Sequence, residues 1–159
     1  MNKLITLFFI LFYAFPNVVF AQLKQANDYY KTYNYAKAIP KYERIEERTK
    51  HHKKEVAEKL ANSYRMTNNY NEAEGKYAKL LAMNNINPVN HLYYGEILKS
   101  NQKTNDAKDQ YTVYADKVPK DDRAKKEINS LIMTRLWTIK QQSYVVYNAE
   151  ALNTSISDF

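Results

Sequence analysis

Apolar and small residues recur along this chain at the spacing of helices that are each buried on one side. They return every three or four positions, and short polar segments such as Asn68-Asn69 separate the runs. The pattern predicts six helices, near residues 22–33, 36–49, 53–67, 70–83, 88–101 and 104–118. A seventh, near residues 121–141, carries apolar residues at helical spacing, namely Ala124, Ile128, Leu131, Ile132, Leu136 and Ile139. We therefore expect an all-α protein.

Three stretches of the chain align with one another at a nearly constant spacing. The small residue of each second helix recurs after 35 and then 34 positions, at Ala38, Ala73 and Ala107. A tyrosine four positions later keeps these offsets, at Tyr42, Tyr77 and Tyr111. The first helices carry their own small residue, at Ala26, Ala61 and Gly95. Small residues let paired helices approach closely and the tyrosine rings can fill the space beside them, so we expect all nine in the core.

A period of about 34 residues with two helices per unit resembles the tetratricopeptide repeat (TPR) family. The resemblance covers residues 22 to about 119 and implies a right-handed superhelix of three helix pairs, 22–52, 53–86 and 87–119. The tryptophan that family members often carry early in the first helix is absent, and only the third repeat closes with a proline, Pro119. Because the last repeat needs its apolar face covered, we expect residues 120–142 to form a capping helix.

Residues 1–21 have the three-part pattern of a secretory signal peptide. Lys3 supplies the positive start, an apolar run extends from Leu4 to Phe20, and Ala21 is small enough for a signal peptidase site. A membrane anchor is the alternative reading, because the run approaches the ~20 residues of a spanning helix. The interruption at Pro16-Asn17 favours cleavage. We therefore expect an exported, periplasmic protein with no transmembrane segment after the leader is removed.

The last residues, 143–159, differ in character from the helices before them. Tyr144-Val145-Val146-Tyr147 is β-branched and aromatic, as in a strand. Leu152-Asn153-Thr154 followed by Ser157-Asp158-Phe159 resembles the start of the WD40-like β-propeller in OmpA-family envelope proteins of Bacteroidetes. Those proteins combine a signal peptide, a TPR region, a propeller and an OmpA-like peptidoglycan-binding domain, and some belong to type IX secretion or gliding machinery. The resemblance implies an outer-membrane-associated adaptor, with peptidoglycan bound only through a domain outside this sequence.

The amino-acid composition excludes several kinds of site and raises a second possible function. The chain has no cysteine, which excludes disulfides and zinc ribbons, and only two glycines, which leave little for phosphate-cradling loops. The formal net charge is +7, and loss of Lys3 with the leader makes it +6. This charge and the 15 tyrosines keep an alternative function open, a basic stand-alone binder of anionic envelope polymers. An AT-rich genome would explain the same composition, and export argues against nucleic acid as the partner.

The sequence offers no constellation for catalysis, a cofactor or a metal ion. It contains no phosphate loop, HExxH, GxSxG or supported nucleophile–base pair. His51 and His52 are adjacent, so they point to different sides of a helix, and no carboxylate follows at ligand spacing. His91 has no acid or base partner nearby in the sequence. We therefore expect a non-enzymatic protein without a cofactor.

A protein or peptide in the cell envelope is the expected partner, and the first helices supply the candidate surface. TPR stacks bind partners mainly on the concave surface that these helices form. Residues spaced i, i+4 and i+7 give one stripe per helix, and together the stripes are Leu23, Asn27, Tyr30, Glu58, Asn62, Arg65, Leu92, Glu96 and Lys99. Their mixture of amides and charges suits an extended peptide or a protein loop. The family's clamp for C-terminal carboxylates is not predicted, because Leu23 occupies one of its lysine positions.

Overall fold

The computed structural model describes residues 21–48 and 53–142 of the protein. The predicted signal peptide falls, apart from residue 21, outside these residues, and so does the strand-like tail. Within them the chain forms a helix over residues 21–31, followed by α2 (Tyr35–Arg48), α3 (Lys53–Met66), α4 (Tyr70–Leu81), α5 (Val89–Ser100), α6 (Thr104–Lys117) and α7 (Arg123–Gln142). The helix ends lie within about two residues of those predicted from the apolar spacing. The all-α prediction is confirmed.

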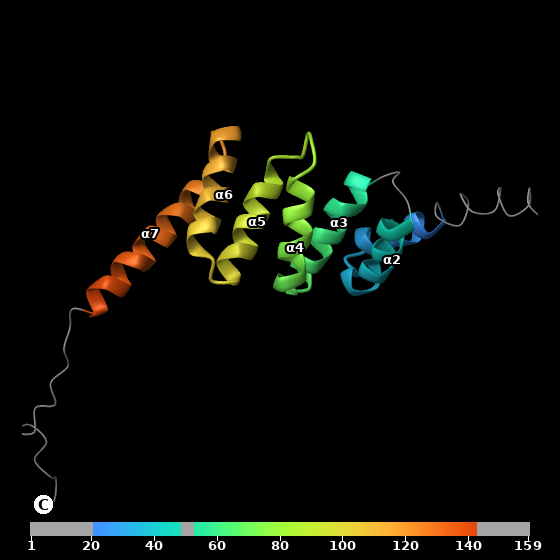
Figure 1. Ribbon diagram of the computed structural model, residues 1–159, viewed down its shortest axis with the longest axis horizontal. Helices are drawn as coiled ribbons and strands as arrows, with labels where there is room; N and C mark the ends of the chain where they lie inside the picture. The colour runs from blue at the N-terminus through green and yellow to red at the C-terminus, as the bar shows by residue number, and fades with distance from the viewer. Residues whose placement is uncertain (1–20, 49–52, 143–159) are drawn as a thin grey trace, which may run out of the picture.

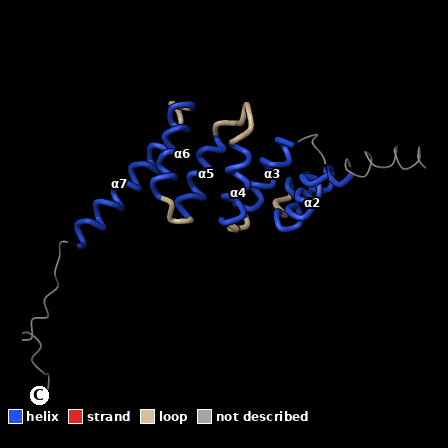
Figure 2. The backbone as a smooth tube through the Cα atoms, viewed as in Figure 1, coloured by secondary structure: helices blue, strands red, loops and turns tan. Residues whose placement is uncertain are grey.

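Consecutive helices pack side by side in a single row, so that each helix from α2 to α7 contacts the next one along the chain (Figure 1). Where the connections between helices are described, they are short loops (Figure 2). Because every contact is between near neighbours in the sequence, the stack has the one-dimensional architecture of a repeat protein. None of the described helices combines the length and the apolar character that crossing a bilayer requires.

The turns inside the three helix pairs share one backbone conformation. Tyr33, Asn68 and Gln102 have φ angles of 59°, 59° and 63°, in the left-handed region that ends helices. The next residue in each turn donates its backbone N–H five positions back, to the carbonyl of Tyr29, Tyr64 and Leu98 at 2.8, 3.0 and 2.8 Å. The repeat therefore includes the backbone hydrogen bonds of the turns. The first turn keeps this conformation although its left-handed residue, Tyr33, is a tyrosine.

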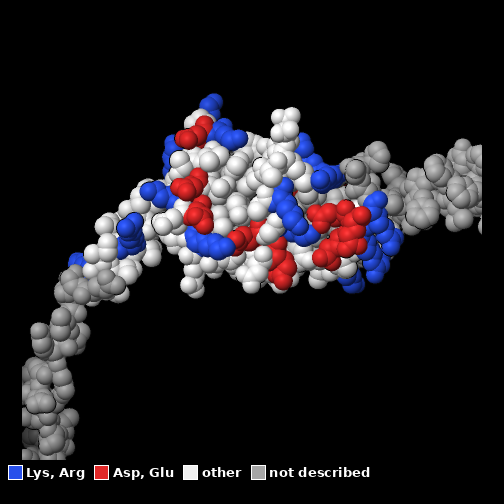
Figure 3. Space-filling model, viewed as in Figure 1, with Lys and Arg blue, Asp and Glu red and all other residues white. Residues whose placement is uncertain are grey.

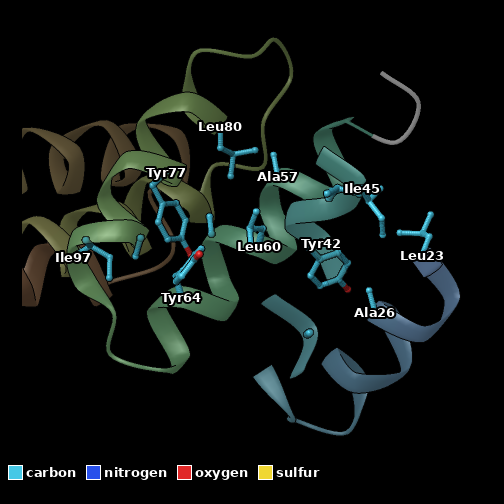
Figure 4. Close-up of a cluster of buried hydrophobic side chains, with 14 residues drawn as sticks. Leu23, Ala26, Tyr42, Ile45, Ala57, Leu60, Tyr64, Tyr77, Leu80 and Ile97 are labelled. Atoms are coloured by element: carbon cyan, nitrogen blue, oxygen red, sulfur yellow. The ribbon is translucent and has the colours of Figure 1, made fainter. Parts of the chain in front are cut away.

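The core consists of two clusters of buried side chains along the stack. The first extends from Leu23 to Ile97, and Figure 4 shows Tyr42 and Tyr77 between the helices beside Leu60 and Ala57. The second extends from Leu92 to Leu131 and includes Tyr111. The nine small and tyrosine positions of the repeat are all buried, at Ala26, Ala38, Tyr42, Ala61, Ala73, Tyr77, Gly95, Ala107 and Tyr111. The prediction that these positions form the core is confirmed.

The helix α7 covers the end of the stack with its first half only. Ala124 and Leu131 are buried against α6, and Ile128 is half-buried beside them. Three apolar residues that the sequence pattern places on the same helix are instead exposed, namely Ile132, Leu136 and Ile139. The reason is length, because α7 has 20 residues and α6 has 14, and α7 projects beyond the row (Figure 1).

Candidate partner-binding face

The candidate site is the surface carried by the helix over residues 21–31, α3 and α5, which we call the first-helix face. Six residues of the predicted stripe lie there partly exposed, namely Asn27, Tyr30, Glu58, Asn62, Arg65 and Glu96. Lys99, at the end of α5, is exposed. A partly exposed polar group is in contact with its neighbours, which limits its movement, and it can still be reached by a partner. A binding surface requires both properties.

Leu23 and Leu92 are corrections to the predicted stripe. Both side chains are buried, with 7% and 1% of their surface exposed, and they belong to the two core clusters. The equivalent position in the second repeat is Glu58, whose Oε1 accepts a hydrogen bond from Asn90 Nδ2 at 2.7 Å. This position lies at the boundary between core and surface, so the two leucines are buried while the partly exposed Glu58 pairs with the buried Asn90 of α5.

A continuous series of hydrogen bonds crosses the first-helix face. Asn62 Nδ2 donates to the Tyr30 hydroxyl at 2.5 Å, and Asn62 Oδ1 accepts from Nε and Nη2 of Arg65 at 3.1 and 2.9 Å. Arg65 Nη1 then donates to Glu96 Oε2 at 2.9 Å. The guanidinium also lies over the Tyr93 ring, 4.0 Å from its centroid. The series thus connects three successive first helices, with Asn62 linking the first to the second and Arg65 linking the second to the third.

Further contacts extend this series at both ends. Lys59 Nζ donates to Asn27 Oδ1 at 2.8 Å and to Glu55 Oε1 at 2.7 Å, while Lys99 pairs with Glu127 of α7. The stripe spacing did not identify Lys59, which lies between two stripe positions. A signal was present, because three linked pairs are each 32 positions apart, namely Asn27–Lys59, Tyr30–Asn62 and Glu58–Asn90. In this protein, two polar residues 32 positions apart on successive first helices can therefore indicate a hydrogen bond between repeats.

The core tyrosines beneath this face, Tyr42, Tyr77 and Tyr111, differ in the hydrogen-bond partners of their hydroxyl groups. Tyr42 donates to Asn27 Oδ1 at 2.7 Å. The positions equivalent to Asn27 are Asn62 and Glu96, whose oxygens accept from Arg65 instead. Within the described residues the buried hydroxyl of Tyr111 accordingly makes no hydrogen bond, and that of Tyr77 lies beside the Arg65 guanidinium. Burial raises the pKa of both phenols, and at Tyr77 the nearby charge of Arg65 partly opposes that rise in pKa.

We expect removal of the hydroxyl to have opposite effects at Tyr111 and Tyr42. Tyr111→Phe removes a buried group without a partner, so the free energy of unfolding should rise by about 1 kcal/mol. Tyr42→Phe removes a donor to Asn27, so the free energy of unfolding should fall by about 1 kcal/mol. Urea denaturation followed by circular dichroism measures both. Changes of the same sign in the two variants would contradict this account of the hydroxyls.

A small pocket opens beside the Arg65–Glu96 pair. Its volume is about 240 Å³, and its lining includes Tyr70, Ile97 and Ser100 as well as the charged pair. Small-molecule sites are typically at least about 300 Å³, so a single side chain of a bound peptide is a better match for this volume. Burial raises the pKa of the Glu96 carboxyl above its usual value, and the nearby charge and hydrogen bond of Arg65 only partly oppose that rise.

Charges of both signs are interleaved over the stack. Ion pairs join successive repeats on the second helices too, as Lys76–Glu46 and Lys103–Glu74 show. On the face shown in Figure 3, acidic and basic side chains lie next to one another over the paired helices. In the parts of the chain that the structure describes, no group of three or more His, Cys, Asp or Glu could hold a metal ion. His91 Nδ1 lies 2.9 Å from Oε1 of Gln110, and His51 and His52 fall outside the described residues.

Solved structures show which known proteins are built in this way. The C-terminal part of a TPR repeat-containing protein from Cytophaga hutchinsonii matches with a TM-score of 0.64 at 22% identity, over 70% of this chain and 44% of that one. The first TPR of Spaghetti (RPAP3), solved with the HSP90 peptide SRMEEVD, matches with a TM-score of 0.65 at 19% identity, over 74% and 93% of the two chains. The first TPR domain of human RPAP3 matches with a TM-score of 0.62 at 20% identity, over 81% and 99%.

The present chain thus spans less than half of the Cytophaga chain and nearly all of the two RPAP3 domains. No protein-family model matches the chain, and no curated protein matches it by sequence. The likeness to these structures therefore lies in the arrangement of the helices, which agrees with the repeat in the sequence. The helix pairs, their shared turns and these neighbours give the described chain the tetratricopeptide repeat fold.

Proposed function

We propose that this protein is a non-enzymatic interaction scaffold that holds an extended peptide or a protein loop on its first-helix face. The observation that carries the proposal is the half-exposed series Tyr30, Asn62, Arg65 and Glu96, which crosses three repeats. A peptide laid across these helices would meet a hydroxyl, an amide, a guanidinium and a carboxylate in turn. A neighbour of the same fold is described with a bound peptide, which supports a peptide as the kind of partner.

A partner that binds this face would replace existing hydrogen bonds within the protein, because the donors of Arg65 are already hydrogen-bonded. The three donor atoms of Arg65 already face Asn62 and Glu96, so an acidic side chain of the partner would have to compete with these acceptors. The pocket beside Arg65 would then receive one neighbouring side chain.

The cell envelope is the proposed setting. The leader motivates export to the periplasm, and the tail motivates membership of an outer-membrane-associated OmpA-family protein, including those of type IX secretion or gliding. The chain would be the adaptor that connects such a protein to its machinery. Seven ion pairs among the described residues pair basic with acidic side chains and leave the net positive charge unchanged, so the salt dependence of binding separates this proposal from a basic polymer binder.

Site-directed cross-linking in the native envelope tests the proposal. A photo-reactive residue at Met66, which lines the pocket beside Arg65, should yield a cross-linked protein partner. The same residue at Lys79, which is exposed on the second helix α4, is the matched control and should not. Arg65→Ala should weaken the cross-link about tenfold, equivalent to about 1.4 kcal/mol, while Lys79→Ala leaves it unchanged.

One control and two contrary outcomes make the result interpretable. Circular dichroism and the melting temperature must show that Arg65→Ala remains folded, since Arg65 also links the repeats. A cross-link that survives Arg65→Ala in a folded protein would place the partner on another face. Binding of lipopolysaccharide that falls steeply with salt, without a protein cross-link, would instead support the polymer binder.

A further inference from the structure

The turn of the first repeat carries three tyrosines in mutual contact, Tyr30, Tyr33 and Tyr35, which we call the turn tyrosines. Tyr33 is 78% exposed, and the other two are partly exposed. The ring centroids of Tyr33 and Tyr35 are 6.2 Å apart at an interplanar angle of 71°, and those of Tyr30 and Tyr35 are 5.4 Å apart at 80°. Tyr30 also contacts the ring of the buried Tyr42 (Figure 4), so the cluster reaches from the core to the surface.

The other two repeats form the same turn with different side chains. The residues equivalent to the turn tyrosines are Arg65, Asn68 and Tyr70 in the second repeat and Lys99, Gln102 and Thr104 in the third. All three turns nevertheless have one left-handed residue and the same backbone hydrogen bond. The fold of the turn therefore does not depend on a tyrosine at position 33.

The position of Tyr33 is unfavourable for a tyrosine in two respects. Its φ angle is 59°, a left-handed conformation that asparagine adopts readily and a bulky residue does not. Its ring is also the most exposed of the large apolar side chains in the described residues. Strained residues of this kind cluster at sites that bind ligands. Because neither the backbone nor the core requires the Tyr33 ring, we infer that it contacts a partner.

The angles between the rings indicate the shape of the group that they would receive. A flat base or sugar ring stacks on a flat aromatic surface, whereas rings inclined at 71° and 80° enclose open corners. A proline ring is compact and apolar and fits such a corner. Extended proline-rich segments bind in aromatic-lined grooves, where their rigid conformation reduces the entropy lost on binding.

The hydroxyl groups of the turn tyrosines match the polar part of such a segment. Those of Tyr33 and Tyr35 make no hydrogen bond to the described residues, and that of Tyr30 accepts one from Asn62. Each hydroxyl therefore has a proton to donate. A proline segment offers carbonyl oxygens and has no N–H at its prolines, so it requires donors from its binding site.

The turn tyrosines also lie at the end of the helix pairs where the first-helix face has its pocket. The lining of the pocket beside Arg65 includes Asn68 and Tyr70, which are the second-repeat equivalents of Tyr33 and Tyr35. The hydrogen bond from Asn62 to Tyr30 connects the two features. A single extended peptide can therefore contact both.

We propose that the turn tyrosines bind a proline-containing end of the peptide that the first-helix face holds. The peptide runs from the pocket beside Arg65 past Asn62, and its proline enters the corner between Tyr33 and Tyr35. This inference rests on the proposed function, because Tyr30 belongs to both surfaces. It adds the chemical class of one end of the partner.

A titration with decaproline, which is already extended, tests the proposal. We follow the backbone amides of the nitrogen-15-labelled chain from Gln22 to Phe159 by nuclear magnetic resonance. Tyr33→Asn gives the first turn the residue of the second, so it removes the ring and keeps the backbone conformation. Gln102→Asn makes the same change in the third turn and is the matched control. Chitohexaose, an oligomer of N-acetylglucosamine, is the glycan probe.

Decaproline should shift the amides of residues 30–35 with a dissociation constant on the order of 1 mM. Tyr33→Asn should weaken binding at least about fivefold, without lowering the melting temperature, while Gln102→Asn leaves binding unchanged. The absence of shifts, or equal binding by the wild type and Tyr33→Asn, would overturn the proposal. Binding of chitohexaose in place of decaproline would also overturn it.

The cross-link from Met66 distinguishes failure of this proposal from failure of the proposed function. A cross-link that depends on Arg65 but is unaffected by Tyr33→Asn, in a protein that does not bind decaproline, would overturn only the role of the turn tyrosines. A cross-link weakened by both Arg65→Ala and Tyr33→Asn would support one continuous peptide. Decaproline binding without any cross-link from Met66 would overturn the proposed function and, with it, the continuous peptide.

Discussion

Replacing Tyr77 with alanine is expected to lower the free energy of unfolding by about 3–5 kcal/mol. The Tyr77 side chain is completely buried in the first core cluster. Its ring stacks on that of Tyr94 in α5, with centroids 6.2 Å apart and an interplanar angle of 24°. Tyr77 lies on α4, so the stack joins the second repeat to the third. Alanine would leave a cavity and remove this contact between repeats.

The effect is large because the middle repeat is coupled to both of its neighbours. In a stack where each repeat contacts only the next, losing the central interfaces separates the terminal repeats from each other. A domain of this size has about 5–15 kcal/mol of stability, so the variant loses a large part of it. Chemical denaturation followed by far-ultraviolet circular dichroism gives the difference directly.

The same substitution at Tyr33 provides the matched control for Tyr77→Ala. Tyr33 is 78% exposed in a turn between paired helices, so Tyr33→Ala should change the free energy of unfolding by no more than about 0.5 kcal/mol. Similar losses at the two positions would mean that burial of the central tyrosine does not determine the stability of the stack.

The fold could be predicted from the sequence because two independent signals agree. Apolar spacing gives the helices, and the 34- to 35-position repeat of Ala38, Ala73 and Ala107 gives their pairing. The turn at Tyr33 illustrates the strength of the repeat. A tyrosine does not by itself indicate a left-handed turn residue, yet its alignment with Asn68 places it in one.

The candidate site was predicted less completely, for a physical reason. Spacing along one helix gives the direction of a side chain but not the depth of the surrounding surface, so the spacing places Leu23 and Leu92 on the surface although they are buried. Spacing also says nothing about how far a side chain reaches toward the next helix. The bridging role of Arg65 depends on that reach. The exposed end of α7 likewise depends on where α6 stops beside it, which is a tertiary fact.

The second large effect is expected at Gly95, where the two helices of the third repeat approach most closely. A Cβ atom added at Gly95 would lie 2.5 and 2.6 Å from Cε1 and Cδ1 of the Tyr111 ring. Tyr111 is itself fully buried, so its ring has no room to move. Gly95→Ala should therefore lower the free energy of unfolding by about 1–3 kcal/mol through overpacking, even though alanine favours a helix by about 1 kcal/mol.

Gly75 separates overpacking from helix propensity, because it lies inside α4 with nothing within 4 Å of an added Cβ. Gly75→Ala should raise the free energy of unfolding by about 1 kcal/mol, the opposite sign to Gly95→Ala. A double-mutant cycle completes the argument. In a Tyr111→Leu background the clashing ring is gone, so Gly95→Ala should cost much less than it does in the wild type. If Gly95→Ala were as favourable as Gly75→Ala, the close approach at Gly95 would not constrain the third repeat.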